Sequence, residues 1–329
     1  MMSELNIAVI GCGKWGMNHV RTAYGIFGER LKFCCDNDPM SKDKVKEIAP
    51  ESMFSTDIED VIKDTSINAA IVSTPAETHF EITKSLLEAG KHVLVEKPIT
   101  LRSSEAKTLN TLALEKGLIL MVGHLLLYHP AILKIKQYLD EGKLGKLQYI
   151  YSNRLNLGTI RTEENILWSF APHDISVIQY FAGSIPEDVK ATGAIFVQEG
   201  IQDTTLTYLN FKENIHAHIY VSWLHPFKEQ RLVVIGDKSM MVFEDTLKDH
   251  KLKFYRKGFE LVNGTPVKID SEYENIEFDS TSPLELEQKH FAECIKSGTA
   301  PRSDGMNAIE VLETLERAQK ELMKDKTTN

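Results

Sequence analysis

The chain has 329 residues, of which 42% are hydrophobic and 26% are charged, an ordinary composition for a folded protein at a length that favours two domains. Its 47 acidic residues outnumber 38 basic ones, and a net charge of -9 leaves no overall positive field to attract nucleic acid. Because no apolar run approaches the roughly 18 residues of a membrane helix, and none near the N-terminus has the length of a signal peptide, we expect no membrane association.

The first 123 residues alternate short apolar runs with helical stretches, as a parallel sheet with crossover helices does. Helical spacing predicts helices over 77–89 and 102–116. Runs rich in branched residues predict strands at 5–10, 31–36, 69–73, 92–96 and 119–123. We therefore expect an α/β domain over residues 1–123.

From residue 124 the pattern changes to longer runs in which apolar and polar residues alternate. These predict antiparallel strands at 147–157, 189–198, 204–211, 215–223 and 231–235. Helices are predicted at 130–141, 174–181, 285–296 and 307–323. We expect residues 124–329 to form an α+β substrate-binding and oligomerisation domain with a large, mainly antiparallel open sheet, whose last helices pack back on the first domain.

A glycine turn joins the first predicted strand to a helical stretch. It reads Gly11-Cys12-Gly13-Lys14-Trp15-Gly16, a Gly-x-Gly-x-x-Gly pattern in the strand-to-helix context that it requires. The glycines permit a tight turn and a close approach of the backbone to a pyrophosphate, and the helix N-terminus offers N–H groups and a positive dipole end. The pattern predicts a Rossmann dinucleotide-binding domain with Gly11, Gly13, Lys14, Trp15 and Gly16 at the cofactor.

Asp36 ends the second predicted strand, where an acidic side chain can accept hydrogen bonds from the adenosine ribose hydroxyls. A carboxylate there repels a 2′-phosphate, and Asn37 and Asp38 supply no arginine to bind one. The sequence therefore favours NAD over NADP. The alternative is that Asp36 is only a turn-forming residue.

The four cysteines, Cys12, Cys34, Cys35 and Cys294, show no spacing typical of a metal site or a redox pair. Cys34 and Cys35 lie in an apolar run, where a free cysteine behaves as a small hydrophobic residue. We expect free thiols, no metal and a cytoplasmic, reducing compartment.

Two further segments, Ser73-Thr74-Pro75-Ala76-Glu77-Thr78-His79 and the stretch from Gly90 to Glu96-Lys97-Pro98, give the chain a family resemblance. Spaced in this way after the glycine turn, they resemble the Gfo/Idh/MocA oxidoreductases, and the antiparallel region resembles the second domain of that family. The resemblance implies that Lys97 lies beside the nicotinamide and the reacting hydroxyl and that a cis bond precedes Pro98. The further cofactor residues that it implies are Ser73, Thr74, Pro75, His79 and Glu96.

The family's third signature, an Asp followed four positions later by a His, reads Ser169 and His173 in this chain. Because Ser169 lacks a carboxylate, it is left open whether an acidic side chain assists His173. A reference pKa near 6.5 suits His173 as the base at neutral pH, whereas a lysine near 10.4 is normally charged. We predict His173 as the base and Lys97 as the group that polarises the oxygen, unless burial beside the nicotinamide lowers the lysine pKa. A helix-start residue bound to the backbone is the alternative for His173.

Residues 153–161 and 163–174 resemble the subgroup of the family that oxidises nucleotide-linked sugars. The resemblance implies oxidation of the C3 hydroxyl of a UDP-linked N-acetylhexosamine such as UDP-N-acetylglucosamine, giving a 3-keto sugar nucleotide that an aminotransferase could take up. Arg154 and Arg161 would suit a pyrophosphate and Trp168 a sugar or uracil face, but a solvated arginine and a core tryptophan are equally open. The substrate-binding candidates are Arg154, Asn156, Arg161, Trp168 and His173.

Other functions remain open at this stage. The substrate could be the uronate UDP-N-acetylglucosaminuronate or a polyol such as inositol, or a 3-keto sugar could be reduced in the reverse direction. A non-catalytic sensor that binds NAD and a sugar is a different class. A sheet with one uncovered face predicts a homodimer or homotetramer.

Overall fold

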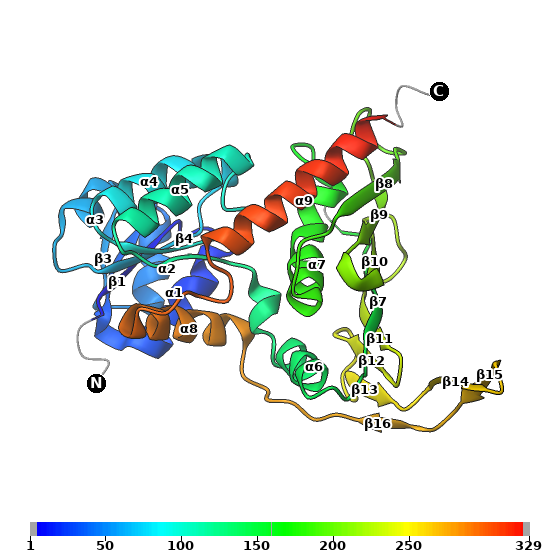
Figure 1. Ribbon diagram of the computed structural model, residues 1–329. Coiled ribbons are helices and arrows are strands. Elements are labelled where there is room, and N and C mark those ends of the chain that lie inside the picture. The colour runs from blue at the N-terminus through cyan, green and yellow to red at the C-terminus, as the bar shows by residue number, and fades with distance from the viewer. Residues whose placement is uncertain (1–4, 159, 325–329) are drawn as a thin grey trace. The chain divides into compact units, whose positions relative to one another are not determined.

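The structure is a computed structural model that describes residues 5–158 and 160–324 (Figure 1). Within these ranges the chain forms two compact units. The first unit runs to Tyr128 and takes up the chain again from Thr281 to Leu312, and the second comprises His129–Ser280 and the chain from Glu313 onward. The change between units therefore falls five residues after the expected position 123, and the chain enters the first unit twice.

The first unit contains a six-stranded sheet in the order β3-β2-β1-β4-β5-β6, in which all pairs are parallel. β1 and β4 are buried along their whole length, as strands covered on both faces must be. The parallel α/β domain predicted from the sequence is confirmed, with β3 as an additional short edge strand. The strands are β1 (Ile7–Ile10), β2 (Leu31–Cys35), β3 (Met53–Ser55), β4 (Ala69–Val72), β5 (His92–Val95) and β6 (Leu120–Val122).

Helices cover both faces of this sheet (Figure 1). α1 contacts α2 and α8 on one face, and α4 contacts α5 on the other. The helices are α1 (Gly16–Phe27), α2 (Ser41–Ile48), α3 (Glu59–Lys63), α4 (His79–Glu88), α5 (Ser103–Glu115) and α8 (Pro283–Ser297), with short 3-10 turns η1 (Gly28–Arg30), η2 (Ala76–Thr78) and η3 (Leu125–Tyr128). Their connections bring the carboxyl ends of the strands to one edge, where open α/β sheets bind ligands.

The second unit contains an eight-stranded sheet in the order β16-β13-β12-β11-β7-β10-β9-β8. It is mainly antiparallel, as expected, but β7 and β10 pair in parallel. The expectation that all the predicted strands are antiparallel is wrong for this pair, because the intervening chain forms a helix and two strands and so can return in the same direction. The strands are β7 (Leu147–Leu155), β8 (Asp188–Ala194), β9 (Thr204–Asn210), β10 (His216–Ser222), β11 (Glu229–Gly236), β12 (Met240–Glu244), β13 (Leu252–Tyr255) and β16 (Tyr273–Asn275).

Strand β10 shows the two unlike faces of this sheet. Ala217, Ile219 and Val221 are fully buried, whereas the alternating residues His216, His218 and Tyr220 are only partly covered. Helix α7 (Ile166–Ala182) contacts β7, β9 and β10 and also α6 (Pro130–Asp140). The outer face carries histidine and tyrosine side chains.

Helix α7 begins earlier than the sequence indicated. The spacing predicted a helix from Asp174 to Phe181, but the helix starts at Ile166 and Pro172 lies inside it. Asn165 caps the helix, since its side chain accepts a hydrogen bond from the backbone N–H of Trp168. His173 is therefore a residue of the helix interior, and the helix-start alternative for it is wrong.

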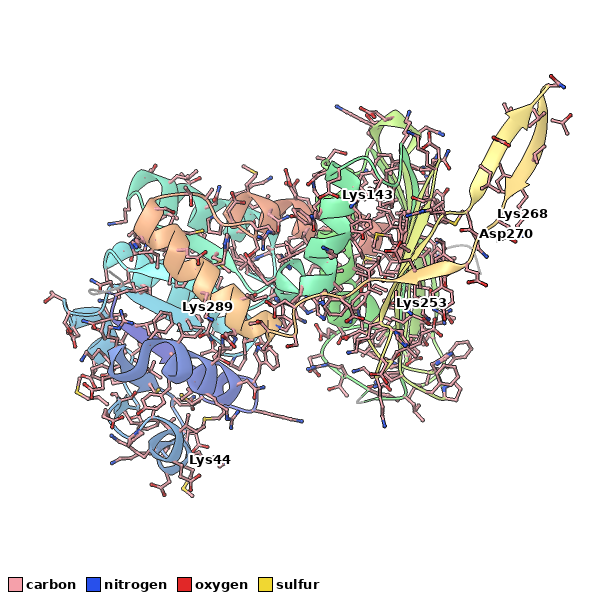
Figure 2. The ribbon with its side chains drawn as sticks, turned by 90° about the horizontal axis from the view of Figure 1, so that it is seen from below. Lys44, Lys143, Lys253, Lys268, Asp270 and Lys289 are labelled. Carbon is pink, nitrogen blue, oxygen red and sulfur yellow. The ribbon has the colours of Figure 1, made fainter. Side chains whose placement is uncertain are left out.

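The remaining elements are peripheral. A hairpin of β14 (Gly258–Val262) and β15 (Thr265–Ile269) stands apart from the large sheet, and Lys268 and Asp270 pair at its base (Figure 2). Helix α9 (Gly305–Lys324) and the turn η4 (Lys212–Asn214) complete the described chain. Among the described helices, none combines the length and the apolar character that a membrane span requires.

Candidate functional site

The glycine turn after β1 is packed so tightly that side chains do not fit at two of its positions. A Cβ on Gly11, whose φ is 89°, would lie 2.7 Å from the backbone of Ser73, and a Cβ on Gly16 would lie 1.9 Å from the carbonyl oxygen of Gly11. At Gly13, by contrast, a Cβ would meet no atom within 4 Å. The turn thus presents open backbone at Gly13, beside the N-terminus of α1, where a pyrophosphate can approach.

Asp36 directly follows β2 at the same edge of the sheet. Its Oδ2 accepts a hydrogen bond from the backbone N–H of Cys12 at 2.5 Å, and its Oδ1 accepts one from Asp38 at 2.9 Å. These contacts fix the carboxylate beside the glycine turn. The position fits an acceptor for ribose hydroxyls, because a carboxylate can accept further hydrogen bonds.

The segment after β4 is tied both to the glycine turn and to the segment after β5. The hydroxyl of Ser73 donates to the carbonyl of Gly11 at 2.8 Å. The buried ring of His79 lies between the carbonyl oxygens of Thr74, at 2.8 Å, and of Pro98, at 2.7 Å. Pro75 precedes the turn η2. His79 therefore holds two loops of the predicted cofactor site in register.

Glu96 and Lys97 follow β5, and the Lys97–Pro98 bond is cis. Glu96 Oε1 accepts hydrogen bonds from Trp15 Nε1 at 2.5 Å and from His19 Nε2 at 2.8 Å, and its Oε2 accepts from the backbone N–H of Lys97 at 3.1 Å. Burial alone would raise the pKa of Glu96, but the contacts with His19 and Trp15 and the charge of Lys97 hold it below its usual range. Glu96 is an ionised anchor for the strand end that carries Lys97.

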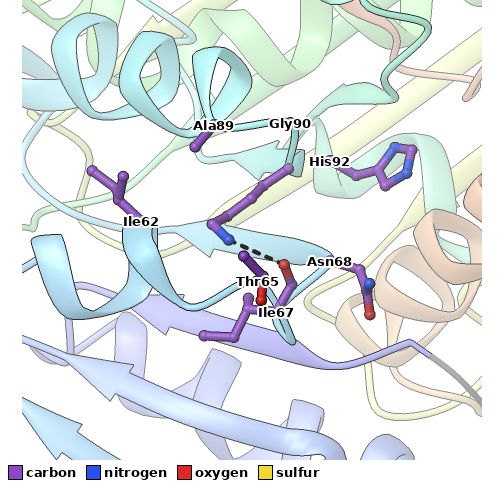
Figure 3. Close-up of a pocket in the computed structure, with 8 residues that line it drawn as sticks. Ile62, Thr65, Ile67, Asn68, Ala89, Gly90 and His92 are labelled. Atoms are coloured by element: carbon purple, nitrogen blue, oxygen red, sulfur yellow. Dashed lines mark hydrogen bonds between the residues drawn. The ribbon is translucent and has the colours of Figure 1, made fainter.

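These residues fit a nicotinamide dinucleotide. The glycine turn, Asp36 and the Glu96–Lys97 segment follow β1, β2 and β5, so they share the carboxyl edge of the parallel sheet. A cavity of about 240 Å³ around Lys91 lies instead at the opposite edge, before β4 and β5 (Figure 3). The Lys91 ammonium there donates to the carbonyls of Asp64 and Ile67, so this cavity is separate from the cofactor site.

In the second unit, α7 carries the candidate base. Ser169 and His173 are one helical turn apart and therefore lie on the same side of α7. The next residue, Asp174, is buried and its carboxylate accepts hydrogen bonds from Ser152, at 2.5 Å, and from Arg154.

Arg154 extends from β7 towards α7 and forms a two-point ion pair with Asp174. Its Nε lies 2.8 Å from Oδ2 and its Nη2 lies 3.1 Å from Oδ1. Burial lowers the pKa of Arg154, but the charge and hydrogen bonds of Asp174 outweigh it and raise the pKa. Two nitrogens of this candidate pyrophosphate ligand are therefore bound within the protein.

The other substrate candidates differ in exposure. Arg161 is half exposed and pairs with Glu163 at 3.2 Å and with Glu164 at 3.5 Å. Trp168 is partly covered, and its Nε1 donates to Gln319 of α9 at 3.1 Å. Asn156 follows β7 and its backbone N–H donates to Ser222. Thr159, within the same segment of the sequence, lies outside the described residues.

Three buried polar residues near Glu96 were not predicted: His19 of α1, and Glu287 and Gln288 of α8. A signal for the last two is present in the sequence, because Leu284, Glu287, Gln288 and Phe291 recur at helical spacing on one face. A carboxylate on the apolar face of a helix indicates a special environment.

The fold and this edge of the sheet define a nicotinamide-dependent oxidoreductase with a Rossmann domain. Residues 5–124 match the model of the oxidoreductase family with an NAD-binding Rossmann fold, and residues 132–242 match the GFO/IDH/MocA C-terminal domain. The chain belongs to the Gfo/Idh/MocA family and is an NAD(P)-dependent dehydrogenase that acts on hydroxyl groups.

Relatives with different substrates resemble this chain to a similar extent. It is 27% identical to scyllo-inositol 2-dehydrogenase (NAD(+)) of Bacillus subtilis, with 92% of this chain and 89% of the relative covered. It is 25% identical to UDP-N-acetylglucosamine 3-dehydrogenase of Acidithiobacillus ferrooxidans, with 94% and 95% covered. The solved structure of that enzyme, GnnA, superposes with a TM-score of 0.84 over 97% of both chains at 23% identity.

Proposed function

We propose that this dehydrogenase oxidises the C3 hydroxyl of a UDP-linked N-acetylhexosamine with NAD, giving a 3-keto sugar nucleotide. The observation that carries the proposal is that Lys97 follows β5 at the edge of the sheet that holds the glycine turn and Asp36. The choice of sugar is supported by residues 153–174 and by the likeness to UDP-N-acetylglucosamine 3-dehydrogenase over nearly the whole chain.

The proposed division of labour follows from the chemistry of the two side chains. Bound NAD would accept the hydride that leaves C3. His173 takes the proton of the C3 hydroxyl as the C=O bond forms, because an imidazole is a suitable base at neutral pH. The Lys97 ammonium donates a hydrogen bond to the same oxygen and stabilises its developing negative charge.

We propose NAD rather than NADP as the cofactor. The Asp36 carboxylate beside the glycine turn would accept hydrogen bonds from ribose hydroxyls and repel a 2′-phosphate. Its contacts with Cys12 and Asp38 support this role, because they keep the carboxylate at the turn in a fixed orientation.

A polyol such as inositol is a second candidate substrate. The likeness to scyllo-inositol 2-dehydrogenase favours it. So does the ion pair of Arg154 with Asp174, because it occupies two nitrogens that a pyrophosphate would need. In the UDP-sugar proposal Arg161 must therefore supply most of the pyrophosphate contacts.

We also propose a cytoplasmic homodimer or homotetramer in which a second copy covers the outer face of the large sheet. On that face Tyr151 stacks on His218 with ring centroids 5.2 Å apart, and the hydroxyl of Tyr149 lies 2.6 Å from His218 Nδ1. Aromatic side chains of this kind are enriched at protein interfaces. Four buried free thiols are compatible with a reducing compartment. A monomeric mass by light scattering at micromolar concentration would contradict the assembly.

The substrate is tested by following reduced cofactor with NAD or NADP against UDP-N-acetylglucosamine, its uronate analogue, inositol and other polyols. Turnover with the unmodified UDP-hexosamine alone is expected. Turnover with inositol alone would replace the proposal by its second candidate. Reduction of a 3-keto sugar without measurable oxidation would reverse the direction, and binding of NAD without any turnover would indicate a sensor.

A further inference from the structure

Five polar side chains form a buried cluster beneath the strand end that carries Lys97. Helix α8 contacts both α1 and the turn η3, so all five belong to the first unit. Four of them have at most 2% of their surface exposed, and the Glu96 side chain has 13%. The members of this buried polar cluster are His19, Glu96, His124, Glu287 and Gln288.

In one half of the cluster, hydrogen bonds join His19 to Glu96 and to the amide nitrogen of Gln288. Gln288 Nε2 lies 3.2 Å from His19 Nδ1 and donates to the backbone carbonyl of His19 at 3.3 Å. With Nδ1 as an acceptor, the ring proton of His19 is on Nε2, from which it reaches Glu96 Oε1 at 2.8 Å. This arrangement fits an ionised Glu96, whose pKa lies below its usual range.

The other half has polar atoms that the described chain does not satisfy. Both carboxyl oxygens of Glu287 and both ring nitrogens of His124 are buried and form no hydrogen bond with any described residue. An isolated ionised carboxylate in such a place is strongly unfavourable, and the usual resolution is to neutralise it. The described residues also contain no group of acidic, histidine or cysteine side chains that could hold a metal ion.

The charges around Glu287 determine how it is neutralised. Glu96, at the end of β5, faces Glu287. Burial and the negative charge of Glu96 together raise the pKa of Glu287 well above its usual range. Tyr128 of η3 also faces Glu287. The Arg302 guanidinium lies over the Tyr128 ring, 5.0 Å from its centroid. Burial and the charge of Lys97 lower the pKa of His124 to about 4, so His124 is neutral as well.

Glu96 connects this region to the proposed catalytic lysine. Its Oε2 accepts from the backbone N–H of Lys97, and a Cβ on Gly123, beside His124, would lie 3.0 Å from its carboxyl group. The Glu96 carboxylate is thus enclosed on several sides. A second negative charge next to Glu96 would repel its carboxylate and so displace the segment that carries Lys97.

We propose that Glu287 is a neutral carboxylic acid in the folded protein and that it acts as a positioning residue for the Glu96–Lys97 strand end. The protonation is independent of what the enzyme oxidises. The positioning role rests on the proposed function of Lys97.

Infrared difference spectroscopy tests the protonation without any substrate. At pH 7 the spectrum of wild type minus Glu287→Gln should contain the C=O stretch of a carboxylic acid. The control is Glu285→Gln, because Glu285 is partly exposed on α8 and pairs at 2.6 Å with Lys289, which Figure 2 labels. Its difference spectrum should contain only a carboxylate band. A carboxylate band alone for Glu287→Gln would overturn the proposal.

Thermal unfolding between pH 4 and pH 9 is the second measurement. Because the folded pKa of Glu287 is raised, its contribution to stability is fully present below the unfolded pKa and is lost as the pH rises through the folded pKa. Relative to wild type, Glu287→Gln should gain thermal stability with rising pH. If that variant does not fold, the acid C=O band should be present in folded wild type and should disappear when wild type is unfolded at pH 7. A band that is absent from the folded protein, or that persists after unfolding, would overturn the proposal.

Turnover tests the positioning role. Glu287→Gln keeps a donor and should stay within about threefold of wild type, whereas Glu287→Leu should lose about tenfold in kcat with little change in KM. Because Glu287 ionises only above its raised pKa, we expect kcat of wild type to fall at alkaline pH, and this fall should be absent in Glu287→Gln. Equal activity of both variants would overturn the positioning role and leave the protonation in place, and no activity in wild type would count against the proposed function alone.

Discussion

The two units build their candidate sites in different ways. In the first unit the glycine turn, the segment after β4 and the segment after β5 are joined largely by hydrogen bonds from a side chain to a backbone carbonyl, as from Ser73 to Gly11 and from His79 to Pro98. In the second unit α7 and β7 are joined through side chains, chiefly the pair of Arg154 and Asp174. A site whose side chains bind backbone groups constrains short stretches of sequence, whereas a site fixed by side-chain pairs can change its ligand with few substitutions. This difference explains why the class of cofactor follows from motifs and the substrate does not.

The largest effects are expected where the two units supply one group each to the proposed reaction. His173→Asn should lose about 10² to 10⁴ in kcat, the usual scale of general-base catalysis, while NAD affinity stays nearly unchanged. Lys97→Ala should also lose turnover, because the reacting oxygen loses a charged donor. Steady-state kinetics as a function of pH measures the turnover of both variants, and calorimetry measures their affinity for NAD.

The pH profile decides which group is the base. With His173 intact, kcat/KM should rise through the range of an imidazole, and this limb should vanish in His173→Asn. If His173→Asn stays active with the limb in place while Lys97→Ala is inactive, the roles are reversed and Lys97 is the base.

The next effect concerns the side-chain pair of the second unit. Asp174→Asn should destabilise the protein by about 3–5 kcal/mol, because it leaves the Arg154 charge buried without its partner. Glu163→Gln removes one of the two acidic partners of the exposed Arg161 and should change stability by less than about 1 kcal/mol. Urea unfolding compares the two. A similar small loss for both variants would show that Arg154 can reach solvent or another anion.

A smaller effect distinguishes two glycines of the first unit. Gly16→Ala places a Cβ 1.9 Å from the Gly11 carbonyl oxygen, so it should destabilise the protein by about 1–3 kcal/mol through overpacking. Gly13→Ala meets nothing within 4 Å and should leave stability nearly unchanged while it weakens NAD binding about tenfold. Equal NAD affinity in Gly13→Ala and wild type would mean that the pyrophosphate does not approach this backbone.

The sequence allowed the parallel sheet of the first unit to be predicted because each strand is a short buried run and the glycine pattern needs one local geometry. Only the edge strand β3 was missed, since its residues Met53, Phe54 and Ser55 are partly exposed and lack an apolar run. Several hydrogen bonds that hold the site together, such as those of Ser73 with Gly11 and of Trp15 with Glu96, join residues far apart in sequence. Local spacing carries no information about such partners.

In the second unit the sequence predicted β7 to β11, but it missed β12, β13 and β16 of the large sheet and the hairpin of β14 and β15. It also did not predict all the directions and partners of the strands. The parallel pairing of β7 and β10 depends on the path of the intervening chain. The start of α7 was placed too late because Pro172 has the same local signature inside a helix as at its beginning. Arg154 was considered as a substrate ligand or a solvated side chain, and its buried pair with Asp174 could not be inferred from either residue alone.

The smallest effect returns to the cofactor side, where a single carboxylate is proposed to choose between two cofactors that differ by one phosphate. Asp36→Ala removes the repulsion of a 2′-phosphate together with the acceptor for the ribose hydroxyls, so NAD should bind about tenfold more weakly and the preference over NADP should narrow. Asp38→Ala is the matched control, because Asp38 is exposed and its Oδ1 accepts only from the nearby backbone N–H of Met40 among the described contacts. The cofactor preference of that variant should equal that of wild type.

Asp36 also binds the N–H of Cys12, so a general loss of the turn would weaken the binding of NAD and NADP alike. Fluorescence titration of both cofactors therefore separates the outcomes: a narrowed ratio supports selection by Asp36, an unchanged ratio with weaker binding of both assigns Asp36 a structural role, and a wild-type preference for NADP contradicts the choice of NAD.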